Sequence, residues 1–394
     1  MKTKLIIFGI TGDLSRRKLL PALGSILTWD DQLSIIGVSR REVNVPELLN
    51  SSVGNDSFAD KVSVFTMDLA TAGDYVGLKA FVDLQGDEQA LIYLSVPPSA
   101  AADIVDFLGQ AEFNSPNVKL LFEKPFGFDL VSAQDYIGRT SQYFEEAQIY
   151  RIDHYAAKEI AQEVVRLRTQ PGLPWNSDTV AAIDIVAAEA IGIEDRATFY
   201  EETGALRDFV QGHLMQLLSL VLMPIPENFD NENLPSYRIQ ALDALDPANP
   251  LETRRAQYEG YQAEAQNVGS LTETFVSMSL HSNDAQWQGV PLRLITGKSL
   301  SEKRSYIKIS YADGNETIIE EGKVPSGEVM YADAYERVLV HAIEGYESIF
   351  TTSPELLRAW QIVKPIQDAW AMDDAPLQTY APGSTIQQVI ENTV

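Results

Sequence analysis

The feature that most constrains the fold is an alternation, in the first 150 residues, of short apolar runs with segments of helical length. The runs are rich in β-branched residues and end in turn residues, which is typical of buried strands. They are Leu5–Phe8, Leu33–Val38, Val62–Phe65, Leu91–Val96 and Val118–Phe122. Strands that alternate with helices form a parallel sheet covered on both faces. We therefore expect an α/β domain of the Rossmann type over residues 1–150.

The turn after the first strand contains two glycines, in Gly9-Ile10-Thr11-Gly12-Asp13-Leu14. In doubly wound sheets this turn holds a dinucleotide pyrophosphate, because glycine lets the backbone approach and the helix N-terminus supplies amides. The third glycine of the G-x-G-x-x-G pattern is missing, so the prediction of a dinucleotide site depends on the position of the turn directly after the first strand. The residues we assign to the cofactor here and at the end of the fourth strand are Gly9, Thr11, Gly12, Asp13, Leu14, Ser95 and Pro97.

The second strand ends in Ser39-Arg40-Arg41. An acidic residue at this place would bind the ribose 2′-hydroxyl of NAD. An Arg instead offers a planar fork that suits the 2′-phosphate of NADP. We expect Arg40 to bind NADP and leave NAD open as the alternative cofactor. A solvent-exposed Arg pair, with Glu42 close enough to pair with one of them, is the competing interpretation.

Lys124 follows the fifth strand, in Glu123-Lys124-Pro125. The proline holds the backbone of Lys124 extended, and ligands of such folds bind at the carboxyl edge of the sheet. Lys124 is therefore a candidate to contact both the cofactor and a substrate hydroxyl. A surface ion pair between Lys124 and Glu123 is the alternative.

An acid, an imidazole, a phenol and an ammonium lie together in Arg151-Ile152-Asp153-His154-Tyr155-Ala156-Ala157-Lys158. Apolar residues at helical spacing predict a helix over Ala156–Leu167, with Asp153 as its N-cap. His154 and Lys158 would then be neighbours on its first turns. Two donors near a helix N-terminus indicate a phosphate site. A capped surface helix with an exposed Lys is the alternative.

Residues 151–394 lack a regular alternation of strands and helices. The strands predicted there are Ala181–Ala188, Leu271–His281, Leu292–Ile295 and Ser305–Tyr311, and the later helices are Leu206–Met223, Tyr331–Glu344 and Pro354–Ala371. Strands without helices between them favour an antiparallel sheet with one covered face. We therefore expect an α+β domain with a large, mainly antiparallel sheet over residues 151–394.

The 394 residues include 56 acidic and 30 basic side chains, for a formal net charge of −26. This charge argues against binding to nucleic acid or to anionic membranes. No apolar run approaches the ~20 residues of a membrane span. The chain has no Cys, and its four His do not cluster with carboxylates at ligand spacing, so we expect no metal site. His213 lies in an apolar helical stripe, where a His is usually a core residue with a partner.

Gly-Ile-Thr-Gly-Asp-Leu, Glu-Lys-Pro-Phe-Gly and Arg-Ile-Asp-His-Tyr, in this order, closely resemble the motifs of the glucose-6-phosphate dehydrogenase family. The resemblance continues through Glu189-Ala190-Ile191-Gly192, Gly204-Ala205-Leu206-Arg207-Asp208, His213, Gly297-Lys298 and Asp333-Ala334-Tyr335-Glu336-Arg337. It spans most of the chain. It implies a cytoplasmic homodimer of the pentose phosphate pathway that oxidises glucose 6-phosphate to 6-phosphogluconolactone with NADP.

The resemblance also implies roles for individual residues. His213 would be the catalytic base, Asp153 the carboxylate that orients it, and Lys124 a donor near the reacting oxygen. The residues implied for the substrate are His154, Tyr155 and Lys158 for the phosphate, Glu189 and Asp208 for sugar hydroxyls, and Lys298 and Lys303 as added positive charge. Ordinary surface carboxylates, and a basic loop paired with Glu302, are the alternatives for the last four.

The chain departs from the family pattern between Tyr311 and Asp333, where it is shorter than we expect. Val324-Pro325-Ser326-Gly327 stands there and no substrate-binding Gln is assigned; Phe128 stands where a basic residue is common. Two other functions stay open. One is another NAD(P)-dependent sugar or sugar-phosphate dehydrogenase, and the other is a non-catalytic protein that binds NADP or a sugar phosphate.

Overall fold

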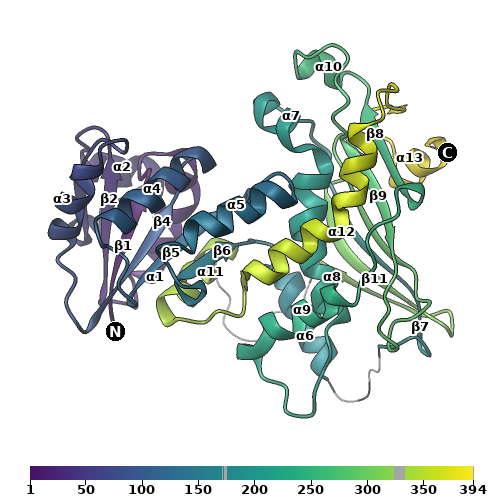
Figure 1. Cartoon of the computed structure of the whole chain (residues 1–394), viewed down its shortest axis with the longest axis horizontal. Helices are drawn as coiled ribbons and strands as arrows, with labels where there is room; N and C mark the ends of the chain where they lie inside the picture. The colour runs from purple at the N-terminus through teal and green to yellow at the C-terminus, as the bar shows by residue number, and fades with distance from the viewer. Residues whose placement is uncertain (171, 173–174, 324–332, 394) are drawn as a thin grey trace. The chain divides into compact units, whose positions relative to one another are not determined.

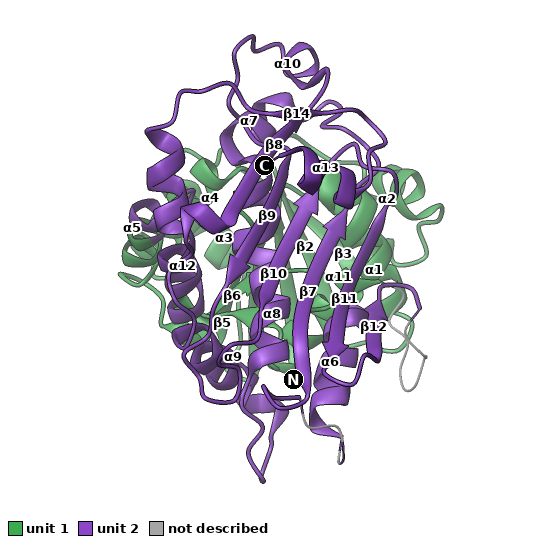
Figure 2. Ribbon diagram, turned by 90° about the vertical axis from the view of Figure 1, so that its right-hand side faces the viewer, with its two compact units in different colours: residues 1–126, 134–157, 328–353 green, residues 127–133, 158–327, 354–394 purple. Residues whose placement is uncertain are grey.

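The computed structural model describes residues 1–170, 172, 175–323 and 333–393, and the chain forms two compact units (Figure 1). Unit 1 comprises Met1–Phe126, Gln134–Ala157 and Glu328–Ser353, and unit 2 comprises Gly127–Ala133, Lys158–Gly327 and Pro354–Val394. Figure 2 colours them separately. The expected division at residue 150 differs from these units because one strand of the first sheet crosses that position, and a later segment returns to pair with it. The Val324–Gly327 segment noted in the sequence lies outside the described residues.

Within the described residues, the sheet of unit 1 has seven strands in the order β13-β6-β5-β4-β1-β2-β3. The parallel strands are β1 (Lys2–Phe8), β2 (Leu33–Ser39), β3 (Val62–Thr66), β4 (Glu88–Leu94), β5 (Val118–Glu123) and β6 (Ile149–Ile152). The short β13 (Phe350–Thr351) pairs antiparallel with β6. The order 3-2-1-4-5-6 is that of the doubly wound dinucleotide-binding sheet. The expected Rossmann-type fold is confirmed.

Helices cover the sheet of unit 1. They are α1 (Leu20–Ile26), α2 (Val45–Val53), α3 (Ala72–Val82), α4 (Pro98–Gln110), α5 (Leu130–Thr140, which begins in unit 2) and α11 (Ala334–Glu344), with the π-helical turn η1 (Ser15–Leu19) and the short 3₁₀ turns η2 (Ala59–Lys61) and η3 (Glu146–Gln148). Buried side chains of β1, β4, α1 and α11 share one core cluster. Tyr331, where we expected the last of these helices to begin, lies outside the described residues; Asp333 caps α11 by accepting hydrogen bonds from the Tyr335 and Glu336 amides.

The described part of unit 2 also holds a seven-stranded sheet, in the order β12-β11-β7-β10-β9-β8-β14. Its strands are β7 (Val180–Ala188), β8 (Thr253–Tyr258), β9 (Phe275–Leu280), β10 (Leu292–Gly297), β11 (Arg304–Tyr311), β12 (Glu316–Glu320) and β14 (Thr379–Tyr380). Pairs β7–β10 and β8–β14 are parallel, and the other pairs are antiparallel. The prediction of a mainly antiparallel sheet is confirmed, although β8, β12 and β14 were not predicted.

The helices of unit 2 lie mainly behind the sheet as it is seen in Figure 2, where β7, β10 and β11 face the viewer. They are α6 (Glu159–Thr169), α7 (Ala197–Ala205), α8 (Met215–Leu222), α9 (Leu234–Asp243), α10 (Tyr261–Glu264), α12 (Ser353–Ala371) and α13 (Ile386–Asn392), with the 3₁₀ turns η5 (Asn231–Asn233) and η6 (Pro250–Glu252). The π-helix η4 (Leu206–Leu214) runs directly into α8, as the predicted helix Leu206–Met223 requires. η4 packs against β7 and β10.

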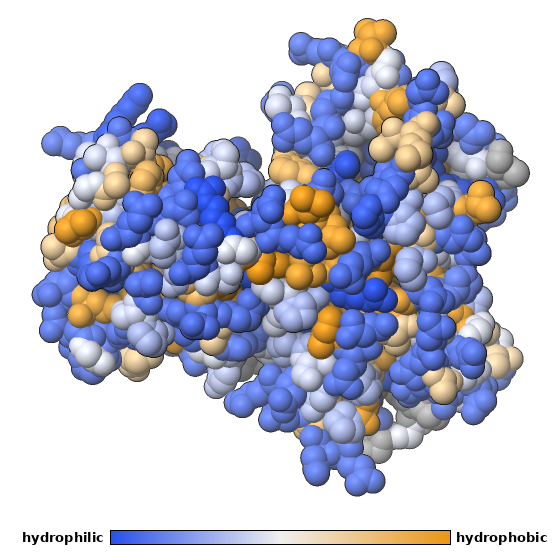
Figure 3. Space-filling model, in the orientation of Figure 1, coloured by the Kyte–Doolittle hydropathy of each residue, from blue (hydrophilic) through white to orange (hydrophobic). Residues whose placement is uncertain are grey.

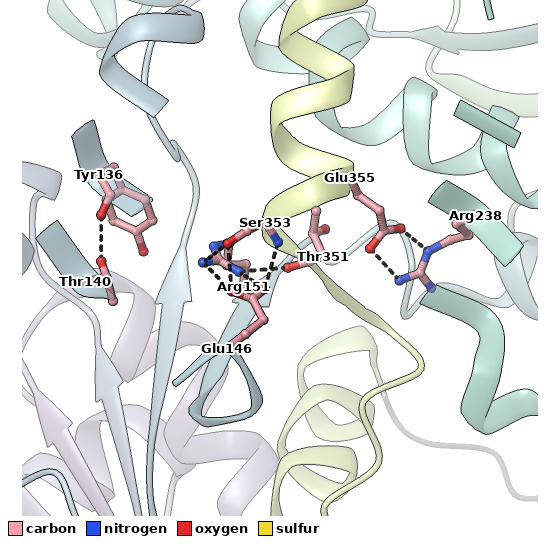
Figure 4. A network of polar contacts seen from close by, with 8 residues as sticks. All are labelled: Tyr136, Thr140, Glu146, Arg151, Arg238, Thr351, Ser353 and Glu355. Atoms are coloured by element: carbon pink, nitrogen blue, oxygen red, sulfur yellow. Dashed lines mark hydrogen bonds and ion pairs between the residues drawn. The ribbon is translucent and has the colours of Figure 1, made fainter. Parts of the chain in front are cut away.

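Buried arginines hold distant segments together within each unit (Figure 4). In unit 1, Arg151 of β6 donates to Glu146 at 2.8 Å, to the Ser353 hydroxyl at 2.8 Å and to the Thr351 carbonyl at 3.4 Å. In unit 2, Arg238 of α9 forms a buried ion pair with Glu355 of α12, with 2.5 Å between Nε and Oε1. Loss of one partner of such a pair typically costs about 3–5 kcal/mol, because a buried charge is left uncompensated. Within the Arg-Ile-Asp-His-Tyr motif, Arg151 therefore stabilises the fold by joining β6 to the segment around β13.

Polar side chains cover most of the face shown in Figure 3, as expected for a net charge of −26. Among the described residues, no helix combines the length and the apolar character needed to cross a membrane.

Candidate active site

The glycine turn after β1 is fixed by hydrogen bonds and by close packing. The Gly12 amide donates to the Gly9 carbonyl at 2.8 Å, and the Ser15 hydroxyl donates to the same carbonyl at 2.9 Å. Gly9 has a φ of +81°, and a Cβ atom there would lie 2.3 Å from the Ser95 carbonyl oxygen. Only glycine fits this position. Helical backbone begins at Asp13, so the first amides of the helix remain available to an anion at this turn.

The other residues assigned to this turn lie around the helix start. Thr11 and Asp13 are exposed, and Leu14 is half-buried. The Thr11 carbonyl accepts a hydrogen bond from Arg16 Nε at 3.1 Å, and Asp13 forms an ion pair with Arg17 at 2.6 Å. The charge of Asp13 is therefore offset locally, which keeps an acidic turn compatible with a phosphate.

Ser95 and Pro97 follow β4, and Arg40 follows β2; these two strands lie on either side of β1. The Ser95 amide donates to the Phe8 carbonyl at 3.1 Å, and Pro97 precedes the first residue of α4. Arg40 is exposed, and neither it nor Arg41 forms an ion pair with any residue that the structure describes. The alternative in which Glu42 neutralises this Arg pair is therefore not realised.

Glu123 and Lys124 follow each other at the end of β5, and the Lys124–Pro125 peptide bond is cis. The Tyr93 hydroxyl of β4 donates a short hydrogen bond to the Glu123 carboxylate. Burial raises the pKa of Glu123 to about 7; the Tyr93 hydrogen bond and the charge of Lys124 oppose this rise, and the charge of Asp153 adds to it. A half-buried acid with a raised pKa thus stands next to the assigned Lys124.

We expected Asp153 to be the N-cap of a helix, and this prediction is wrong. Residues 154–157 form turns, and α6 begins only at Glu159 with Lys158 as its N-cap residue. The buried Asp153 carboxylate instead accepts a hydrogen bond from the Tyr155 amide at 2.9 Å, which closes a local turn. The expectation that His154 and Lys158 share the first turns of one helix is likewise wrong, because His154 lies in the turns and the helix begins only after Lys158.

His154 and Tyr155 remain in unit 1, beside α11. The His154 ring lies edge-on to the buried Tyr155 ring, with 5.1 Å between centroids, and stacks on Tyr335 at 6.3 Å. Lys18 lies 5.9 Å from the Tyr335 ring and also pairs with Asp333 at 3.4 Å. From the sequence, we named Tyr335 only as part of a family motif and did not name Lys18.

In unit 2, the π-helix η4 carries Asp208 and His213. The His213 side chain is buried and lies edge-on to Phe209, with 5.5 Å between ring centroids. A π-helix is rare and is frequently found at functional sites. Because His213 belongs to unit 2 and Asp153 to unit 1, the pairing of these two side chains stays a prediction.

Glu189 and Lys298 form a short ion pair at the ends of β7 and β10. The Lys298 side chain is buried, and its Nζ lies 5.2 Å from the centre of the Tyr200 ring and 6.0 Å from that of Phe209. Burial, and then the nearby charges of Asp208 and other acids, raise the pKa of Tyr200 well above its usual value. These contacts bring Glu189, Lys298 and η4 together in unit 2.

Lys158 and Lys303 have different surroundings. Lys158 Nζ forms an ion pair with Glu321 at 2.9 Å. Lys303 is exposed between β10 and β11. The expected alternative, a basic loop paired with Glu302, does not hold for Lys298, whose partner is Glu189.

Glu273 is a residue of this region that the sequence reasoning missed. Its buried carboxylate accepts a hydrogen bond from the Leu206 amide at 2.8 Å, and its carbonyl accepts one from the Ala205 amide at 3.0 Å. Gly204 has a φ of +59°, and a Cβ there would lie 2.4 Å from Glu273 Oε1. Glu273 therefore fixes the start of η4. The signal available was a lone acid in the apolar segment predicted as the strand Leu271–His281.

Comparison with known proteins matches both units. The family model described as glucose-6-phosphate dehydrogenase, NAD binding domain, matches residues 6–163, and the model of the C-terminal domain matches residues 172–330 and 326–393. The chain belongs to the glucose-6-phosphate dehydrogenase family. A dinucleotide with a nicotinamide ring is therefore its cofactor class.

Individual relatives of the glucose-6-phosphate dehydrogenase family match nearly the full chain. The glucose-6-phosphate 1-dehydrogenase of Gluconobacter oxydans is 30% identical over 460 aligned positions, which cover 96% of this chain and 93% of the relative. That of Helicobacter pylori is 29% identical, with 95% of each chain covered.

Solved structures of the family match as closely in fold. A glucose-6-phosphate dehydrogenase in complex with its substrate glucose-6-phosphate has a TM-score of 0.90 at 26% identity, over 100% of this chain and 97% of that chain. The Mycobacterium avium glucose-6-phosphate 1-dehydrogenase has a TM-score of 0.84 at 28% identity, over 98% and 95%.

This glucose-6-phosphate dehydrogenase family member is shorter than some of its relatives, as the sequence indicated. The alignment to the Gluconobacter oxydans protein has 460 positions, more than the 394 residues of this chain. The model of the C-terminal domain matches in two pieces that meet at residues 326–330, inside the segment between Tyr311 and Asp333. The extra residues of longer relatives are therefore compatible with an insertion at that place.

We expect Glu123→Gln to remove a pH dependence of stability. The folded Glu123 has a pKa of about 7, against an ordinary value of 4.5. Between these values the native state binds the proton more tightly than the unfolded state, so stability falls as pH rises through this window and then levels off. The loss in the wild type should be about 1–3 kcal/mol, measured as the free energy of unfolding in urea at pH 5 and pH 8.

The Gln side chain retains an oxygen that can accept the hydrogen bond from the Tyr93 hydroxyl, so the variant should fold. Glu42→Gln, at an exposed position, serves as the matched control and should keep the wild-type slope. If the free energy of unfolding of Glu123→Gln changed with pH as much as that of the wild type, Glu123 would not be the group with the raised pKa.

Proposed function

We propose that this chain oxidises D-glucose 6-phosphate to 6-phospho-D-glucono-1,5-lactone, with NADP⁺ as the hydride acceptor. The observation that carries the proposal is the match of the whole chain to a glucose-6-phosphate dehydrogenase solved with glucose-6-phosphate. The reaction is the oxidative entry to the pentose phosphate pathway, and a cytoplasmic location is part of the proposal. The residues of both units fit these ligands.

The nucleotide would bind at the carboxyl edge of the sheet of unit 1. The Gly9–Gly12 turn and the first helical amides suit the pyrophosphate, and Ser95 and Pro97 line the neighbouring strand end. The exposed guanidinium of Arg40 suits a 2′-phosphate. When bound, the nicotinamide ring accepts a hydride from C1 of the sugar.

His213 would take the proton of the C1 hydroxyl. An imidazole suits this step, because its ordinary pKa lies closest to neutral pH, and such a base contributes about 10²–10⁴-fold to the rate. Asp153 would accept a hydrogen bond from the imidazole, fix its tautomer and stabilise its protonated form. Lys124 would donate to the reacting oxygen, next to the half-buried acid Glu123.

The remaining side chains would orient the sugar phosphate. His154, Tyr155 and Lys158 would hold the phosphate, and Glu189 and Asp208 would accept hydrogen bonds from sugar hydroxyls. Because Lys298 is paired with Glu189, we assign Lys298 to holding that carboxylate in place, with Lys303 adding positive charge. The structural match to a substrate complex favours this function over a different sugar dehydrogenase.

We also propose a homodimer formed through the face of the unit 2 sheet seen in Figure 2. Two ion pairs join neighbouring strands on this face: Arg293 pairs with Asp184 at 2.5 Å, and Lys308 pairs with Glu316 at 2.6 Å. Asp184 lies opposite both Arg293 and Lys308 in the strand register. A face with alternating charges on fixed strands can meet its own copy about a two-fold axis.

Replacing His213 with Asn should abolish turnover and leave NADP binding nearly intact. We expect kcat with glucose 6-phosphate to fall by about 10²–10⁴-fold, since a general base contributes that much. Steady-state kinetics and NADP titration by fluorescence measure the two effects. Loss of NADP binding would mean that His213 is a structural residue, and a strong preference of the wild type for glucose over glucose 6-phosphate would favour another sugar dehydrogenase.

Replacing Arg40 with Ala should weaken NADP much more than NAD. Hydrogen bonds to charged groups contribute about 1.5–3 kcal/mol, so the KM for NADP should rise roughly 10- to 100-fold. The KM for NAD, measured with the same preparation, is the internal control and should change little. Equal effects on the two cofactors would remove the 2′-phosphate assignment.

Reversing one charge on the sheet face should dissociate the dimer. We expect Arg293→Glu to be a monomer in analytical ultracentrifugation at micromolar concentration, because each copy would then juxtapose like charges. Arg166→Glu is the matched control, since Arg166 lies on α6 and should leave the dimer intact. A monomeric wild type would overturn the proposed dimer.

A further inference from the structure

Lys158 already holds an anionic partner within unit 2. Its Nζ lies 2.9 Å from Oε2 of Glu321. The Lys158 side chain is 17% exposed and that of Glu321 is 40% exposed, so the acid lies on the solvent side of the pair. A carboxylate and a phosphate oxygen accept the same charge-assisted hydrogen bond from an ammonium. The two anions would therefore use the same donor.

The backbone places Glu321 at this position. It directly follows β12, and its amide donates to the Ser305 carbonyl of β11 at 3.0 Å. α6, which begins at the residue after Lys158, packs against β12. The preceding acid, Glu320, is directed differently: it pairs with Arg304 at 2.8 Å and with Lys323 at 2.9 Å. Adjacent acids thus serve separate cations.

We infer that Glu321 is a built-in competitor of the substrate phosphate for Lys158. The inference rests on the phosphate-binding role proposed for Lys158. To engage Lys158, the substrate phosphate must displace the Glu321 carboxylate or share the ammonium with it, and in either case the two anions lie close together. Both effects weaken the binding of the sugar phosphate. Glu321 therefore sets the affinity for phosphorylated substrate without taking part in the chemical step.

The competition predicts a gain of affinity when the acid is removed. Ion pairs between partly exposed side chains are weak, so removal of Glu321 should lower the KM for glucose 6-phosphate by about two- to five-fold. The kcat and the KM for NADP should stay within about two-fold, because neither the base nor the nucleotide site is changed. A residue that merely positions Lys158 would give the opposite sign, a rise in KM.

The experiment compares Glu321→Gln with Glu320→Gln in the full chain. Both variants remove one negative charge from adjacent positions, so they change the long-range field almost equally. Only Glu321→Gln should lower the KM for glucose 6-phosphate, and it should also lower the inhibition constant of inorganic phosphate by a similar factor. An unchanged or raised KM for Glu321→Gln, or an equal fall for both variants, would overturn the inference.

Lys158→Ala separates this inference from the proposed function. If Lys158 binds the phosphate, Lys158→Ala raises the KM for glucose 6-phosphate, and Glu321→Gln added to it no longer lowers that KM. If Lys158→Ala raises the KM and Glu321→Gln alone does not lower it, the competition is overturned and the phosphate role stands. If Lys158→Ala leaves the KM unchanged, both the phosphate role and the competition are overturned.

Discussion

The common register of the parallel strands in unit 1 is the constraint on which its site depends. Phe8 of β1 lies opposite Val38 and Leu94, Leu94 opposite Phe122, and Phe122 opposite Arg151. The residues that follow this row therefore leave the sheet at one edge, and they include the glycine turn, Ser95, Lys124 and Asp153. The row itself is buried, so the strands cannot shift without exposing apolar side chains. Packing of the sheet thus decides where the polar groups emerge.

In unit 2, the register of one parallel strand pair inside a mainly antiparallel sheet likewise places site residues side by side. β7 and β10 are parallel neighbours, with Ala188 opposite Gly297, so Glu189 and Lys298 emerge side by side and pair. Beside them, Glu273 holds the start of the π-helix that carries His213. In each unit, these candidate site residues either follow the end of a parallel strand or lie on a helix that packs against such strands.

The sequence predicted the features that periodicity records. Apolar runs located the parallel strands of unit 1, because strands buried on both faces are nearly continuous in apolar residues. Short exposed strands such as β12 (Glu316–Glu320) carry no such signal, so Glu321 and its pairing with Lys158 were not foreseen. The N-cap expected at Asp153 failed because an Asp can close a local turn as readily as a helix start, and sequence spacing does not distinguish the two. The family resemblance named His213 and Lys298, but spacing along the sequence does not show contacts between distant segments, such as that of Lys298 with Glu189.

Because acidic side chains outnumber basic ones in this chain, the candidate cations for anionic ligands differ in whether an acid already pairs with them. Within the described residues Lys158 is paired with Glu321 and Lys298 with Glu189, whereas Arg40 has no ion pair. Binding of a phosphate at a paired cation exchanges one ion pair for another, so the measured affinity is a difference between two similar free energies. Binding at Arg40 carries no such exchange. If the proposed assignments hold, the nucleotide phosphate would meet a cation without an ion pair and the sugar phosphate would compete with an acid for its cation, so substitutions at the acids should change substrate affinity more than cofactor affinity.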